Sequence, residues 1–162
     1  LHEVGHAVDA SRGFMLSRGA GEAFGGWTDH GSDLSPIAAV AAAHFSISEA
    51  AALACLSGDV VVPEDGDTPE ALAAARAWCA SVRVDQALWD HGAAAEAAAI
   101  DGIIYQEAYP GRWVSYRAAA RRKGLTGYQF RAAGEWFAEL YAGWHSGRLK
   151  DSHPAQSWLK EL

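Results

Sequence analysis

The five residues His2-Glu3-Val4-Gly5-His6, near the start of the chain, constrain its fold more than any other feature. On an α-helix, residues four positions apart lie on one face, a turn apart, so His2 and His6 can reach the same ion. Imidazole nitrogens are common Zn²⁺ ligands, and the Glu3 carboxylate beside them can take a proton from water. The H-E-x-x-H pattern therefore predicts a helix over residues 1–12 that carries a zinc site, with Glu3 as general base.

A catalytic zinc site with two histidines and a water needs a third protein ligand. The short form of this motif would have a histidine at residue 12 and a glycine at residue 9, but the chain has Arg12 and Asp9 there. The third ligand must therefore come from another part of the chain. The side chains considered for it are Glu22, His30, Asp33, Glu49, Glu135 and Glu139.

The segment 126–145 offers the best of these candidates. We expect one long helix here; with Glu135 at zero and 100° per residue, Glu139 falls at about 40° and Tyr128 at about −20°. One face therefore carries two carboxylates and a phenol. The opposite face carries the apolar side chains Phe137, Leu140, Tyr141 and Trp144. Glu135 is the preferred third ligand, and His30, on the loop after the first helix, is the alternative that would complete a three-histidine site.

The rest of the chain is rich in alanine and poor in β-branched residues, which favours a mainly α fold. The glycine-rich segment 13–34 is expected to be a long loop, and residues 60–62 a short strand. A helix should begin at Ser35-Pro36, and Ser46 and Glu49 have capping-box spacing before a helix that ends at Gly58. Further helices are predicted over 68–90, 93–109, 113–123 and 153–162.

The length and the net charge of the chain make some classes of function less suitable than others. The chain has 162 residues, the size of one domain, and its net charge of −7 argues against nucleic-acid binding. The sequence has no run of 18 apolar residues, so it predicts no membrane-spanning helix. Cys55 and Cys79 lie in apolar surroundings and are interpreted as buried free thiols.

Two segments resemble a known family. "HEVGHAVD" at 2–9 and "EWFAELYAGWHS" at 135–146 are similar to the catalytic domain of anthrax lethal factor and related bacterial gluzincin metallopeptidases. That family has H-E-x-G-H-x-x-D, then a tyrosine, then E-x-F-A-E seven residues after it; here the tyrosine is Tyr128. The resemblance covers about thirty residues, and residues 13–125 match no part of the family.

The resemblance implies roles for particular residues. His2, His6 and Glu135 would be the zinc ligands, Glu3 the general base, and Tyr128 the group that stabilises the oxyanion. Glu139 would orient a ligand histidine, and Asp9 would do similar work.

The resemblance also implies a fold and a setting. Residues 1–162 would be a single zinc metallopeptidase catalytic domain, mainly α, with any small β-sheet lying upstream of residue 1. The upstream part of the same polypeptide is then an expected partner, and the protein would be a secreted or translocated bacterial toxin or effector. Its substrate would be a protein or peptide, which it would cleave as an endopeptidase. The alternative function is a helical binding or scaffold module that keeps a relic zinc site.

Overall fold

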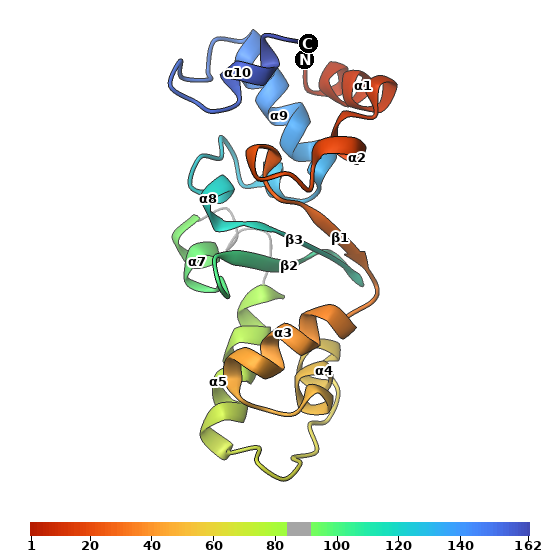
Figure 1. The fold of residues 1–162 in the computed structure, drawn as a ribbon, viewed down its shortest axis with the longest axis vertical. Helices are drawn as coiled ribbons and strands as arrows, with labels where there is room; N and C mark the ends of the chain where they lie inside the picture. The colour runs from red at the N-terminus through yellow and green to blue at the C-terminus, as the bar shows by residue number, and fades with distance from the viewer. Residues whose placement is uncertain (84–91) are drawn as a thin grey trace.

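The computed structural model describes residues 1–83 and 92–162. Its helices and strands follow one another along the chain as in Figure 1. In order, they are α1 (His2–Arg12), α2 (Phe14–Arg18), the 3₁₀-helix η1 (Glu22–Phe24), β1 (Thr28–Gly31), α3 (Ser35–Phe45), α4 (Glu49–Ser57), α5 (Pro69–Val82), α7 (Gly92–Ala97), β2 (Ile103–Tyr109), β3 (Arg112–Arg117), α8 (Ala118–Arg121), the 3₁₀-helix η2 (Tyr128–Phe130), α9 (Ala133–His145) and α10 (Gln156–Leu159). Over the described residues the fold is mainly α, as the composition predicts, and it also contains a small antiparallel sheet.

The elements form three layers along the long axis of the molecule. Figure 1 shows α1, α9 and α10 at one end, the sheet in the middle, and α3, α4 and α5 at the other end. Both chain termini lie at the α1 end, where the Arg12 guanidinium donates a 2.8 Å hydrogen bond to the Leu162 carbonyl oxygen. The first helix and the C-terminal residue are therefore neighbours although almost the whole chain separates them.

The sheet has the order β1-β3-β2, and both pairs are antiparallel. β2 and β3 form a hairpin closed by Pro110-Gly111, where Gly111 has a φ of 71°. β1 pairs with β3 through Thr28 opposite Ser115 and Asp29 opposite Val114. We expected any small sheet to lie upstream of residue 1, but this sheet lies within the chain, between the two motif segments.

Two predicted helices are wrong because the sheet replaces them. The 93–109 segment is helical only over α7 and then becomes β2, where Ile103, Ile104 and Tyr105 favour a strand. The 113–123 segment is β3 followed by the short α8. The predicted 13–34 loop contains α2, η1 and β1, and residues 60–62 form no strand.

The predicted helix boundaries are partly correct. α1 and Gly58, which caps the end of α4, are as expected. α3 begins at Ser35 with Leu34 as its N-cap, one residue earlier than a Ser35 cap would give. Ser48, not Ser46, caps α4, since its hydroxyl accepts a hydrogen bond from the Ala51 N–H. α5 ends at Val82, and the remainder of the predicted 68–90 helix falls mainly outside the described residues.

Two further predictions from the C-terminal half also need correction. α9 begins at Ala133, not near 126, and Tyr128 lies in the preceding η2. The predicted terminal helix over 153–162 is reduced to α10.

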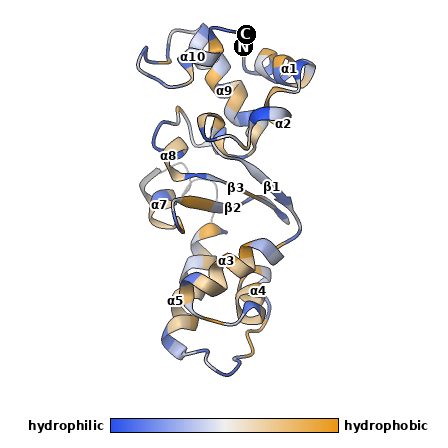
Figure 2. Ribbon diagram, viewed as in Figure 1, coloured by the Kyte–Doolittle hydropathy of each residue, from blue (hydrophilic) through white to orange (hydrophobic). Residues whose placement is uncertain are grey.

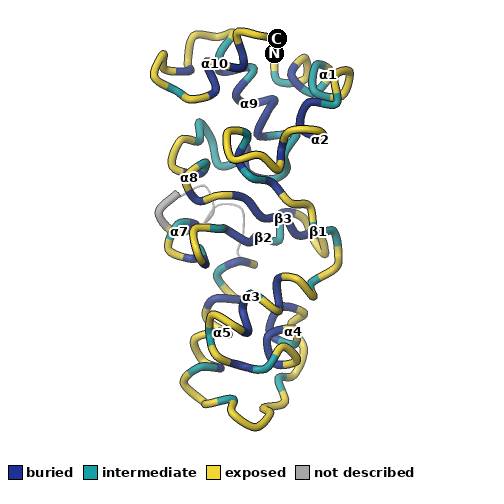
Figure 3. Tube along the Cα trace, in the orientation of Figure 1, coloured by how far each residue is buried: buried dark blue, intermediate teal, exposed yellow. Residues whose placement is uncertain are grey.

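The apolar core runs through all three layers. Figures 2 and 3 show apolar, buried segments in α3–α5, in the sheet and in α9. Trp27, in the glycine-rich segment, is buried and packs on Tyr116 and Phe130, so it anchors that segment to the sheet. Cys55 and Cys79 are buried free thiols, as predicted. No single described helix is long and apolar enough to cross a membrane, although α3 and α4 reach the length and composition together, with a 119° bend between them.

Candidate metal centre

The two motif segments meet where α1 crosses α9. Gly5 is the buried residue of α1, and a Cβ built on it would lie 2.8 Å from the Ala138 Cα. Gly5 lies between His2 and His6 in the sequence, just as Ala138 lies between Glu135 and Glu139. The two backbones can approach this closely only because both contact residues are small. The crossing brings the polar side chains of the two helices together.

The largest apolar side chains at the start of α1 do not take part in this crossing. Leu1 and Val4 are 60% and 47% exposed. Val8 packs against the core. The buried side of α1 is therefore made by its glycine and not by its largest apolar residues.

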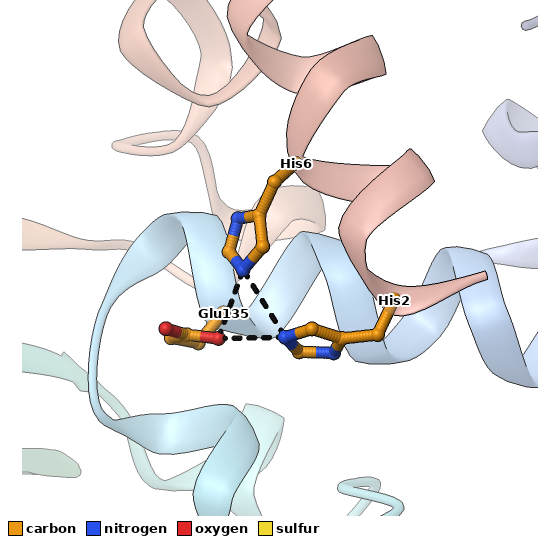
Figure 4. Close-up of side chains that lie close together, drawn as sticks. All are labelled: His2, His6 and Glu135. Atoms are coloured by element: carbon orange, nitrogen blue, oxygen red, sulfur yellow. Dashed lines mark hydrogen bonds and ion pairs between the residues drawn. The ribbon is translucent and has the colours of Figure 1, made fainter.

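Three ligand atoms converge at the crossing, as Figure 4 shows. The Nε2 atoms of His2 and His6 are 3.1 Å apart, and each lies 3.1 Å from Oε2 of Glu135. These residues form a group of metal-ligating side chains that could hold one ion. The side chain of Glu135 is 15% exposed and that of His6 is 34% exposed, so the group opens to solvent on the His6 side.

This donor set fits Zn²⁺. Two imidazole nitrogens and one carboxylate oxygen are the ligands of many catalytic zinc sites. Bonds of about 2.0–2.1 Å in a tetrahedral site place neighbouring ligand atoms about 3.3–3.4 Å apart. The observed 3.1 Å separations need only small adjustments to reach that value. His2, His6 and Glu135 would thus supply three ligands and leave a fourth position for water or substrate.

Glu139 and Thr126 hold His2 in place. Oε1 of Glu139 lies 2.8 Å from Nδ1 of His2, and because a carboxylate accepts hydrogen bonds, Nδ1 carries the proton. The lone pair of Nε2 is then directed at the group of ligand atoms. The Thr126 hydroxyl donates to Oε2 of Glu139 at 3.0 Å and accepts from the Gln129 N–H at 3.2 Å. Thr126 is not among the residues predicted from the sequence, because no motif marks it.

Tyr128 reaches the site from η2. Its hydroxyl donates a 3.3 Å hydrogen bond to Oε1 of Glu135, the oxygen that does not face the histidines. Burial raises the pKa of the Tyr128 phenol, and the adjacent Glu135 carboxylate raises it further. The phenol therefore keeps its proton at neutral pH and can donate a hydrogen bond.

Glu3 lies next to the ligands along α1. It is exposed and makes no hydrogen bond or ion pair with another residue in the described ranges. Its carboxylate is thus available to water and to a bound substrate.

Asp9 and His30 do not join the ligand atoms. Oδ1 of Asp9 accepts a 2.7 Å hydrogen bond from the Met15 N–H, which fixes the turn between α1 and α2. His30 lies on β1, and its Nε2 is 2.9 Å from the Ser115 hydroxyl on β3. Burial lowers the pKa of His30. His30 is not part of the metal-ligating group formed by His2, His6 and Glu135.

Comparison with protein families, with curated proteins and with solved structures found no match to this chain. The resemblance to lethal factor and related gluzincins stays a hypothesis carried by the two motif segments.

Proposed function

We propose that the chain is a zinc-dependent endopeptidase of the gluzincin type, with a zincin-like catalytic domain over residues 1–162. The observation that carries the proposal is the convergence of His2, His6 and Glu135 from helices α1 and α9. Two further groups support it: Glu3, which follows His2 on α1, has an unpaired carboxylate, and the Tyr128 phenol donates a hydrogen bond to Glu135. A purely structural zinc site is usually closed by four protein ligands and needs neither group.

Each residue has a separate task in peptide hydrolysis. A bound Zn²⁺ would act as a Lewis acid toward water and the scissile carbonyl. Glu3 takes a proton from the attacking water and returns it to the amine that leaves. The Tyr128 hydroxyl donates a hydrogen bond to the carbonyl oxygen as it gains negative charge. Glu139, held by Thr126, keeps the His2 ring in its tautomer and orientation.

The proposal is tested with two kinds of variant. Metal analysis should find about one zinc per chain in the wild-type protein and in Glu3→Ala, and none in Glu135→Ala. Cleavage of a proteome-derived peptide library should be present in the wild type and lost in Glu3→Ala. Glu49→Ala is the matched control, because Glu49 is also an exposed glutamate in the first turn of a helix.

Two results would count against this proposal, the first against its mechanism and the second against an enzyme. Full cleavage by Glu3→Ala would remove the general base from the mechanism. Stoichiometric zinc in the wild type without cleavage of any peptide would favour the alternative, a helical scaffold with a relic zinc site.

A further inference from the structure

A hollow of about 210 Å³ lies where four separate segments of the chain meet, and none of the candidate metal ligands lines it. Its lining includes Gly25 after η1, Ala119 and Ala120 on α8, Trp136 on α9 and Ala155 at the start of α10. These residues give it a largely apolar surface. An apolar cavity of about 150 Å³ accepts benzene, so this hollow has room for one aromatic ring with a short side arm.

His153 joins two walls of the hollow. Its Nε2 lies 2.8 Å from the Lys123 carbonyl oxygen, which can only accept, so this ring nitrogen donates. Its Nδ1 accepts a 3.1 Å hydrogen bond from the Ala155 N–H. The end of α8 and the start of α10 are therefore tied together by hydrogen bonds, which hold the hollow open without a ligand.

The charged groups of the lining leave one positive charge unbalanced. Nη1 of Arg117 lies 3.6 Å from Oε1 of Glu22, and both side chains are largely exposed, so this ion pair is weak. Lys123 is exposed, and its ammonium makes no hydrogen bond or ion pair with another residue in the ranges 1–83 and 92–162. The protein as a whole has a net charge of −7, so two cations at one hollow are a local exception that favours an anion.

The buried indole of Trp27 adds an unpaired donor next to the same wall. Trp27 is 6% exposed, and its Nε1 has no hydrogen-bond partner among the residues that the structure describes. A Cβ built on Gly25 would lie 2.6 Å from this Nε1, so the nitrogen faces the space that a side chain at Gly25 would fill. A Cβ on the next residue, Gly26, would lie 3.2 Å from Nε of Arg117. An indole N–H and a guanidinium therefore lie beside the same glycine pair, and a ligand with acceptor oxygens suits both.

We propose that this hollow is a binding site for a small aromatic carboxylate, with the ring against Trp136 and the alanine side chains and the carboxylate toward Arg117 and Lys123. Burial of the ring removes apolar surface from water on both sides of the contact. The carboxylate receives charge-assisted hydrogen bonds from the two cations, whereas an ammonium group is repelled by them. The inference does not depend on peptidase activity, because the hollow and the candidate metal centre share no residue.

Isothermal titration calorimetry tests the site with sodium phenylacetate, 2-phenylethanol and 2-phenylethylamine, which share a ring and a short arm and differ in charge. Lys123→Gln removes one cation, and Lys150→Gln is the matched control, because Lys150 is also an exposed lysine but does not line the hollow. Ala120→Phe fills the hollow. Since a carboxylate can also bind zinc, this last variant separates the hollow from the metal centre. Circular dichroism shows whether each variant keeps the fold.

The wild-type protein should bind phenylacetate at least about fivefold more tightly than 2-phenylethanol, and 2-phenylethylamine more weakly still. Lys123→Gln should weaken phenylacetate binding about two- to fivefold, Lys150→Gln should leave it unchanged, and Ala120→Phe should abolish it. Equal affinities for the three compounds, no binding of phenylacetate at millimolar concentration, or unchanged binding by a folded Ala120→Phe protein would overturn the proposal. If Ala120→Phe unfolds, equal phenylacetate affinities of the two lysine variants would overturn it.

Discussion

Replacing Gly5 with alanine should weaken zinc binding although no ligand is changed. The new Cβ would lie 2.8 Å from the Ala138 Cα, whereas carbon atoms in contact are about 3.5–4.0 Å apart. The backbone of Ala138 cannot rotate away as a flexible side chain could. α1 must therefore move off α9 by roughly 0.7–1.2 Å. His2 and His6 move with α1, while Glu135 stays on α9.

The size of this movement decides the outcome. Widening the 3.1 Å separations between the histidine nitrogens and Oε2 of Glu135 by that amount takes them past the roughly 3.3–3.4 Å of a tetrahedral zinc site. We expect zinc affinity to fall about 10–100-fold, the range seen when the support of metal ligands is lost. Stability is a poorer readout, since overpacking costs about 1–3 kcal/mol and alanine in a helix recovers about 1 kcal/mol.

The assay is a zinc competition titration against a chromophoric chelator, run beside thermal unfolding. Gly134→Ala is the matched control, because Gly134 is also a helical glycine at this crossing. Its added Cβ would meet nothing closer than Oδ2 of Asp9 at 3.6 Å, an ordinary contact. It should keep its zinc affinity and gain up to about 1 kcal/mol of stability. Equal zinc affinities for the Gly5→Ala and Gly134→Ala proteins would refute the account of the helix crossing.

Three further predictions concern the support of the site and the core. Thr126→Val removes the hydroxyl that donates to Glu139, so zinc affinity should fall about tenfold in the competition titration, while Thr126→Ser restores it. Tyr128→Phe should lower kcat about 10²–10³-fold with unchanged zinc content, and steady-state kinetics showing a change in KM alone would contradict its role as an oxyanion donor. Burial raises the pKa of the Cys79 thiol to about 12, so it is almost entirely protonated at pH 8. Mass spectrometry should therefore find Cys79 alkylated by iodoacetamide only after unfolding, and rapid alkylation of the native protein would show that the thiol is not buried.

Short patterns in the sequence correctly predicted the features that depend only on residues close together in the chain. The H-E-x-x-H segment is helical, Gly58 ends a helix, and the expected apolar stripe of α9 packs into the core through Phe137 and Leu140. Each of these features depends on residues within about two turns of one another. The periodicity of its own helix marked Glu135 as a candidate, but its contact with the histidines joins residues 133 positions apart and is not local.

The strands could not be predicted in this way. β1 pairs with β3, more than eighty residues further along the chain, and neither strand has a regular alternation of apolar and polar residues. Alanine-rich flanks made 93–109 and 113–123 look helical, because helix propensity is a local property and strand pairing is not. The contact between Thr126 and Glu139 is likewise a product of tertiary structure, since η2 and α9 are separate elements and not one helix.

The sheet also explains how motifs 129 or more residues apart can form one site. β1 follows α1 and α2 along the chain, and β3 precedes η2 and α9, so the pairing of β1 with β3 brings the two ends of the chain to the same side of the sheet. After β1 the chain leaves the sheet and forms α3, α4 and α5 on the opposite side, as Figure 1 shows, and it returns to the sheet at β2. The length of this helical insertion therefore has little effect on the distance between His6 and Glu135. That distance depends on the strand pairing and on the contact of Gly5 with Ala138, and both of these lie outside the set of ligands.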